Sequence, residues 1–202
     1  RTFVPPMMFN NCGNMGLPLA VLAYGQPGFS AMVALFTISN LLHFTLGVWI
    51  IDHHAKFGRL LRNPIVLATV VGFVFAAFHP PLPEWLMQAL KLTGDAMIPL
   101  MLISLGVRLS DVPWSSWRVG VIGGLVRPLT GLAIAAALLL LLPLDRDQQG
   151  LLLLFGCLPP AVLNFMLAEQ FHQEPGKVAS IVLIGNFLAV ATVPLGLALA
   201  LR

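Results

Sequence analysis

The side chains best placed to do chemistry are the asparagines of two apolar stretches, each of which is interrupted by glycine or proline. The first stretch reads NNCGNMGLPLA over residues 10–20, and the second reads FGCLPPAVLNFMLAEQF over residues 155–171. A proline removes a main-chain N–H, so the carbonyl groups one turn upstream lose a hydrogen-bond partner. Side-chain amides offer donors and acceptors to freed main chain, to an ion or to a solute. These stretches are therefore the first candidates for a binding site.

Both stretches would supply polar groups to one compact site if they met inside a membrane. Unpaired main chain is costly in lipid and must face protein or a water-filled cavity. Where a helix restarts, its free N–H groups and the positive end of its dipole attract an anion. The alternative for either stretch alone is a proline kink that neighbouring helices relieve. The predicted substrate-binding residues are Asn11, Asn14, Gly16, Pro18, Pro159, Pro160 and Asn164.

Ionisable side chains inside apolar runs form a second group of candidates. Asp95, with Lys91 one helical turn away, would bind a proton or cation, or would be solvated near the outer interface. Arg127 would pair with an anionic substrate or with Asp95. The favoured interpretation of Arg127 is snorkelling or structural pairing. For His43, in NLLHFTLG, a satisfied buried histidine is favoured over a proton relay.

The composition is that of an integral membrane protein. Of the 202 residues, 58% are hydrophobic and 9% are charged, whereas a soluble domain carries about 25% charged residues. The sequence pI is near 9.3, but the basic residues are spread over predicted loops without a basic stripe, which argues against nucleic acid. Cys12 and Cys157 lie in apolar segments far apart in sequence, and we expect buried thiols rather than a disulfide scaffold.

The spacing of reactive side chains does not match an enzyme. No nucleophile–base pair, phosphate-binding loop or metal-ligand spacing can be found in the sequence. We therefore expect neither catalysis nor a bound metal or organic cofactor. A coupling ion stays open: H⁺ would bind through Asp95, and Na⁺ would bind through carbonyl groups exposed at the interruptions.

Hydropathy and helix breakers predict an all-α membrane protein, a polytopic helical bundle of seven spans. Each predicted span has about 20 residues or more, enough to cross ~30 Å of hydrocarbon. The turns at 52–63 and 108–118 carry basic residues and should be cytoplasmic. The C-terminus then lies outside, in a cytoplasmic membrane. The predicted spans are 3–24, 28–51, 63–82, 85–108, 117–143, 149–171 and 177–201.

The two interrupted stretches belong to an internal duplication. Each ends in an aromatic residue and a similar turn, YGQPG or FHQEPG, and each is followed by a helix with one asparagine, Asn40 or Asn186. By the predicted orientation the two units are inverted, an arrangement that indicates a transporter site near the membrane midplane. We assign 1–51 to the remainder of a first repeat, 52–63 to a cytoplasmic linker and 64–202 to a complete second five-helix repeat. Three further spans are expected before residue 1.

Four segments give the sequence a family resemblance. NNCGNMGLPLA, GDAMIPLMLISLGVRL (94–109), VRPLTG (126–131) and CLPPAVLNFMLAEQF resemble the auxin efflux carrier family, in its bacterial malonate or dicarboxylate branch. The resemblance implies ten spans as two inverted five-helix repeats, with two helices that cross at prolines. It also implies elevator-like transport of small organic anions, and homodimers are common in the family. The crossing residues that it carries over are Asn14, Pro18, Pro159, Pro160 and Asn164.

The expected function is therefore secondary transport of a small carboxylate such as malonate, malate or an auxin-like acid. A sodium/solute symporter of the bile-acid type is the alternative within transport, and Na⁺ dependence of binding would separate the two. A membrane sensor or assembly subunit that transports nothing is the alternative from another class. It would keep the interrupted helices but would show no solute flux.

Overall fold

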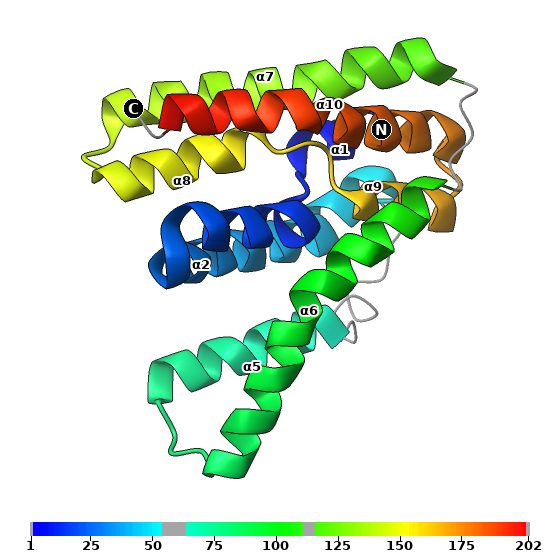
Figure 1. The fold of residues 1–202 in the computed structure, drawn as a ribbon. Helices are drawn as coiled ribbons and strands as arrows, with labels where there is room; N and C mark the ends of the chain where they lie inside the picture. The colour runs from blue at the N-terminus through cyan, green and yellow to red at the C-terminus, as the bar shows by residue number, and fades with distance from the viewer. Residues whose placement is uncertain (1, 54–63, 111–115, 201–202) are drawn as a thin grey trace.

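The computed structural model describes residues 2–53, 64–110 and 116–200, and the regular structure within these ranges is helical (Figure 1). This confirms the all-α prediction. The basic turn at 54–63, which carries most of the orientation argument, lies outside the described residues. The helices are α1 (Val4–Met8), the π-helix η1 (Cys12–Gly16), α2 (Leu17–Leu42), the π-helix η2 (His43–Gly47), α3 (Val48–Ile51), α5 (Pro64–Phe78), α6 (Glu84–Ser110), α7 (Trp117–Leu141), α8 (Arg146–Cys157), α9 (Val162–Gln170) and α10 (Pro175–Ala200).

Three helical stretches among the described residues are long and apolar enough to cross a membrane: Cys12–Ile51, Trp117–Leu141 and Pro175–Leu199. Large apolar side chains on their outer faces are exposed, for example Leu140 at 88% and Val190 at 79%. Such side chains are stable against lipid rather than water. The protein is therefore a multi-pass helical membrane protein. The full number of seven spans stays a prediction.

Helix α2 contains a reversal of the chain at the predicted turn. Gly25 adopts φ 64° and ψ −154° inside it, a left-handed backbone that residues other than glycine rarely adopt. Figure 1 shows the two halves of α2 side by side. A Cβ built on Gly16 would lie 3.3 Å from the Met32 sulfur, so residues before the turn face residues after it. The predicted division between spans 3–24 and 28–51 is thereby confirmed.

Helices α7, α8 and α10 pack against one another on the other side of the molecule (Figure 1). A Cβ placed on Gly124 of α7 would lie only 2.8 Å from the Cα of Gly185 on α10. Small residues at such contacts let two helices approach closely, which is the main source of helix association in lipid. Helix α8 starts with a capping box, since the Asp145 carboxylate accepts from the Gln148 N–H at 2.8 Å.

The main apolar core lies where the hairpin of α2 meets α8. Its buried members include Leu17 and Met32 from α2 and Leu154 from α8. Both cysteines are buried in it as free thiols, as predicted. In Figure 1, α5 and α6 extend away from this body, and α6 contacts η1. The core therefore surrounds the interrupted stretches and holds them in place.

Candidate functional site

The two interrupted stretches cross and pair through their main chains. The Asn11 N–H donates to the Pro159 carbonyl at 2.8 Å, and the Ala161 N–H donates to the Phe9 carbonyl at 3.0 Å. Asn10 and Pro160 form an antiparallel bridge between these two bonds. The stretches therefore run in opposite directions where they meet, and each supplies hydrogen-bond partners to the other.

The second interruption lies at the two prolines, as predicted. Helix α8 ends at Cys157, and α9 begins at Val162. Between them Leu158 and Ala161 are extended, with ψ of 144° and 139°. Two successive residues without an N–H cannot continue the helical hydrogen bonds, so the chain stays extended until α9 begins.

The first interruption lies earlier than the position of Pro18. The non-helical chain covers Phe9–Asn11, with Phe9 extended, and Pro18 is the second residue of α2. Helix α2 continues directly from η1, and the Leu17 N–H donates to the Cys12 carbonyl, so Pro18 removes one N–H without ending the helical chain. The π-helix η1 lies between, and the Gly16 N–H donates to the Asn11 carbonyl at 3.1 Å. Single π-turns are common at functional sites.

Two asparagines of the second half cap carbonyl groups of the crossing. Asn164 Nδ2 donates to the Phe9 carbonyl at 3.1 Å and to the Ala161 carbonyl at 3.0 Å. Asn186 Nδ2 donates to the Pro160 carbonyl at 3.1 Å. Asn186 is held in turn by Asn11, whose Nδ2 donates to Asn186 Oδ1 at 2.8 Å. These buried amides replace the main-chain donors that the interruptions remove.

The last carbonyl groups of α8 are capped by two other elements. Asn10 Nδ2 donates to the Phe155 carbonyl at 2.6 Å, and Arg127 Nη1 of α7 donates to the Gly156 carbonyl at 3.1 Å. A cation at a helix C-terminus also meets the negative end of the helix dipole. Arg127 is 4% exposed. Of the two favoured interpretations, snorkelling or structural pairing, this hydrogen bond agrees with structural pairing, with a main-chain carbonyl as the acceptor.

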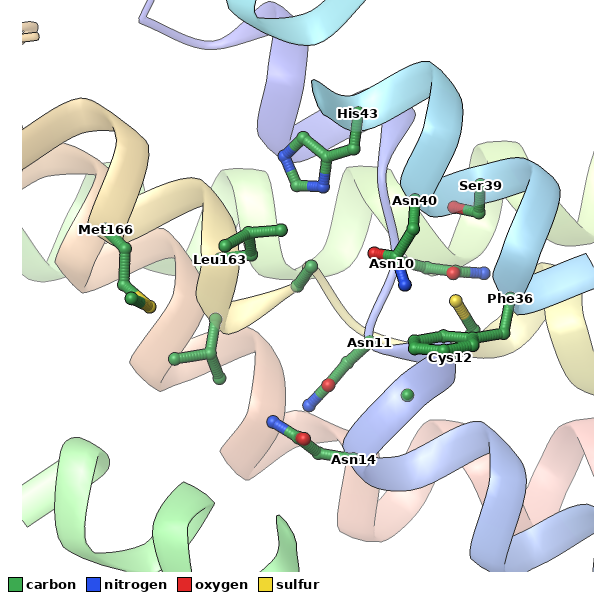
Figure 2. A pocket seen from close by; sticks show the side chains of 13 residues that line it. Asn10, Asn11, Cys12, Asn14, Phe36, Ser39, Asn40, His43, Leu163 and Met166 are labelled. Atoms are coloured by element: carbon green, nitrogen blue, oxygen red, sulfur yellow. The ribbon is translucent and has the colours of Figure 1, made fainter. Parts of the chain in front are cut away.

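A pocket of about 220 Å³ opens beside the crossing. Figure 2 shows its amide side chains, with the ring of His43 near them. Its wall is formed by η1, the second half of α2, the extended residues at the second interruption and α9. The polar residues that line it are Asn10, Asn11, Asn14, Ser39, Asn40 and His43, and the apolar ones include Phe36, Leu163 and Met166.

The structure divides the seven predicted substrate-binding residues into two groups. Asn11 and Asn14 line the pocket. The other five build the crossing: Gly16 packs against Leu158, Pro160 lies against Gly185, Asn164 caps carbonyl groups, and Pro18 and Pro159 are buried. Whether these residues contact a solute stays a prediction.

Four polar residues of the pocket are missing from that predicted set. Asn10 is adjacent to Asn11, but nothing in the sequence distinguishes which of the two faces a cavity. Ser39, Asn40 and His43 lie within about one helical turn of one another, in the helix that follows the first interrupted stretch. That spacing is the signal that would have found them. His43 is buried as expected. Its Nε2 has no partner within hydrogen-bond distance among the described residues, although the Asn164 side chain interacts with the ring, so a satisfied histidine stays a prediction.

The two predicted coupling residues do not pair with each other. Asp95 is exposed on α6, whereas Arg127 is buried against Gly156. Arg127 lines a second pocket of about 350 Å³, otherwise mostly apolar, between α1, α7 and α8. A role for either residue in coupling stays a prediction.

The sequence is similar to known and proposed transporters. The family model described as "Membrane transport protein" matches residues 54–197. A Rhizobium meliloti (strain 1021) protein, provisionally named a malonate transporter, is 26% identical over 205 residues, which cover 92% of this chain and 62% of that protein. Auxin efflux carrier component 3 of Arabidopsis thaliana is 24% identical over 139 residues, which cover 65% of this chain and 22% of that protein.

An uncharacterized transporter of Methanocaldococcus jannaschii is also similar, with 21% identity over 206 residues that cover 93% of this chain and 64% of that protein. The chain thus spans less than two thirds of the length of each of these relatives.

Proposed function

Because the chain belongs to the membrane transport protein family, which includes the auxin efflux carriers, we propose that it binds and moves small organic anions across a membrane. Membership places it among transporters rather than enzymes. Malonate and auxin appear in the names of its relatives, and a small carboxylate is the substrate class proposed for this chain.

The observation that carries the proposal is the amide-lined pocket at the crossing of two interrupted helices. Pockets of this kind, at the midplane and between inverted repeats, are where secondary transporters bind their solutes. The volume of about 220 Å³ lies below the roughly 300–1,000 Å³ of pockets that hold drug-sized ligands. It therefore suits a solute of a few carbons.

The lining chemistry supports a carboxylate. The pocket-lining residues include no Asp or Glu, so no acidic side chain there repels an anion. Asn14 and Asn40 each carry two N–H donors, and Ser39 carries a hydroxyl donor. Carboxylate oxygens accept hydrogen bonds from such groups.

The carbonyl groups of the interruptions favour this family over a sodium symporter. Phe9, Phe155, Gly156, Pro159 and Pro160 each have a carbonyl oxygen that already accepts from a protein donor. Arg127 places a fixed positive charge against one of them, at Gly156. Na⁺ needs several oxygen ligands, and at these carbonyl groups it would compete with protein donors.

The mechanism proposed is elevator-like alternating access in a cytoplasmic membrane. The parts are those expected from the sequence: 1–51 from a first inverted repeat, 52–63 as a cytoplasmic linker, and 64–202 as the second five-helix repeat of a ten-span protein. The C-terminus would lie outside, and a homodimer is the proposed assembly. The exposed apolar side chains of α5 and α6, such as Phe73 and Leu100, support contact with lipid or other helices.

Uptake of radiolabelled malonate into proteoliposomes tests the proposal. Asn14→Ala removes an amide that lines the pocket and should reduce uptake strongly. Gln149→Ala is the matched control, because it removes an amide that donates to the Leu144 carbonyl at 2.8 Å, away from the pocket. Equal uptake by the two variants, or no uptake by the wild type, would count against the proposed function.

A further inference from the structure

His43 presents a buried ring nitrogen that lacks a partner in the described part of the chain. The residue is 2% exposed, and its Nε2 is among the buried polar atoms without a hydrogen bond. Its ring stacks on Phe9 with 4.1 Å between centroids and 9° between planes. This stacking fixes the orientation of the ring, so Nε2 has a defined position in the site and does not rotate freely.

His43 lies at the junction of the two halves. It begins the π-helix η2 and lines the pocket together with Asn10, Asn14 and Asn40. The side chain of Asn164, from α9 in the second half, interacts with the His43 ring, although its buried Oδ1 lies beyond hydrogen-bond distance of any donor among the described residues. The two unpaired atoms therefore come from opposite sides of the crossing.

Two asparagines at the crossing present free acceptors rather than free donors. Asn10 and Asn164 use their Nδ2 groups on main-chain carbonyls, so the unused atom of each is an acceptor, Oδ1. A bound carboxylate adds further acceptors. A neutral imidazole has one donor nitrogen and one acceptor nitrogen, whereas a protonated one has two donors. A proton on His43 would therefore add a donor, and a compensating positive charge, to those of Asn14, Asn40 and Ser39.

The elements packed around His43 bring few other charged or titratable groups. The pocket wall adds only the Cys12 thiol, from η1. Helix α9 carries Glu169, which is exposed, and α2 carries Tyr24 near the end opposite to His43. Asp52 follows α3, more than two helical turns after His43. Burial disfavours a charged imidazole unless an anion lies beside it. An arriving carboxylate would be that anion.

We propose, resting on the proposed function, that His43 is a protonatable ligand of the pocket. When the carboxylate binds, Nε2 takes a proton from solution and donates a hydrogen bond to a carboxylate oxygen. When the anion leaves, the proton leaves with it. Anion and proton thus occupy the site together, and the buried charge of a monoanion is cancelled. This role belongs to His43 and not to the exposed Asp95.

Binding of radiolabelled malonate to the purified full chain, measured between about pH 5.5 and 7.5, tests the assignment, since this range brackets the ordinary pKa of histidine near 6.5. If binding takes up one proton, wild-type affinity should fall about tenfold per pH unit as pH rises, beyond the titration of malonate itself. His43→Gln keeps an N–H donor but cannot titrate, so this additional slope should vanish. His53→Gln, at an exposed histidine, should keep the wild-type slope.

The ¹⁵N spectrum of the wild-type imidazoles provides a second measurement that needs no substitution. Addition of malonate at constant pH should convert one histidine from the neutral to the charged form. Equal slopes in wild type and His43→Gln, or unchanged histidine signals when malonate binds, would overturn the role of His43 and leave the proposed function standing. Failure of the wild type to bind malonate at any pH would contradict the proposed function, and this role with it.

Discussion

The main-chain N–H of Asn11 donates to the carbonyl of Pro159 at 2.8 Å, so two helices interrupted 148 positions apart complete each other's hydrogen bonding. The reverse bond, from Ala161 to Phe9, makes the exchange mutual. Main chain that would be unpaired in lipid is thus satisfied inside the protein. The remaining polar groups at the crossing are free to line a pocket.

Asn164 should be required for stability. Asn164→Ala removes the side-chain donor that the Phe9 and Ala161 carbonyls share. Both carbonyls keep a main-chain donor, so the loss is that of buried hydrogen bonds worth about 0.5–1.5 kcal/mol each. We expect a lower unfolding temperature in detergent for this variant. Asn14→Ala, at a half-buried pocket position, should leave the unfolding temperature close to that of the wild type. Similar losses in both variants would contradict the division between crossing residues and pocket residues.

The close approach of α7 and α10 gives a second stability prediction. A Cβ at Gly124 would lie 2.8 Å from the Cα of Gly185, which is main chain and has little room to shift. Gly124→Ala should therefore destabilise the protein by about 1–3 kcal/mol, the usual cost of overpacking.

The matched control for that substitution is Gly94→Ala on α6, where an added Cβ would meet nothing within 4 Å. Alanine is preferred over glycine inside a helix by up to about 1 kcal/mol. This variant should be as stable as the wild type or slightly more stable, as measured by thermal unfolding. A control that lost as much stability as Gly124→Ala would show that the helix contact is not the cause.

Transport should not require Na⁺. The carbonyl groups at the interruptions accept hydrogen bonds from protein donors, and the Arg127 guanidinium donates to the Gly156 carbonyl of α8. Malonate uptake into proteoliposomes should therefore be unchanged when choline replaces Na⁺ at constant pH and ionic strength. Loss of uptake on this replacement would favour the sodium-symporter alternative.

The sequence predicts the second interruption better than the first. Pro159 and Pro160 both lack an N–H, so a local rule is sufficient to end the helix there. Gly25 is similar, since its turn needs a left-handed backbone. The first interruption is different: the local rule points to Pro18, whereas the chain leaves the helix at Phe9–Asn11. Its partners, Pro159 and Ala161, become neighbours only in the folded protein.

The direction of individual side chains is the part that sequence patterns do not determine. Asn14 and Asn164 both follow an interruption, yet Asn14 lines the pocket while Asn164 reaches back to the Phe9 carbonyl. Nδ2 of Asn10 donates to the Phe155 carbonyl, whereas Oδ1 of Asn10 has no hydrogen-bond partner among the described residues. These choices depend on which carbonyl lies within reach, and that follows from the packing of α8, α9 and α10 around the crossing.

The most direct test of the account asks whether the solute occupies this pocket. Ser39→Cys places a thiol on the pocket wall with minimal change of shape, and Gln26→Cys places one at an exposed polar position in the turn of the α2 hairpin. Malonate should slow the reaction of a small thiosulfonate reagent with the first thiol and leave the second unaffected. Reaction at Ser39→Cys that is unchanged by saturating malonate would contradict the central claim.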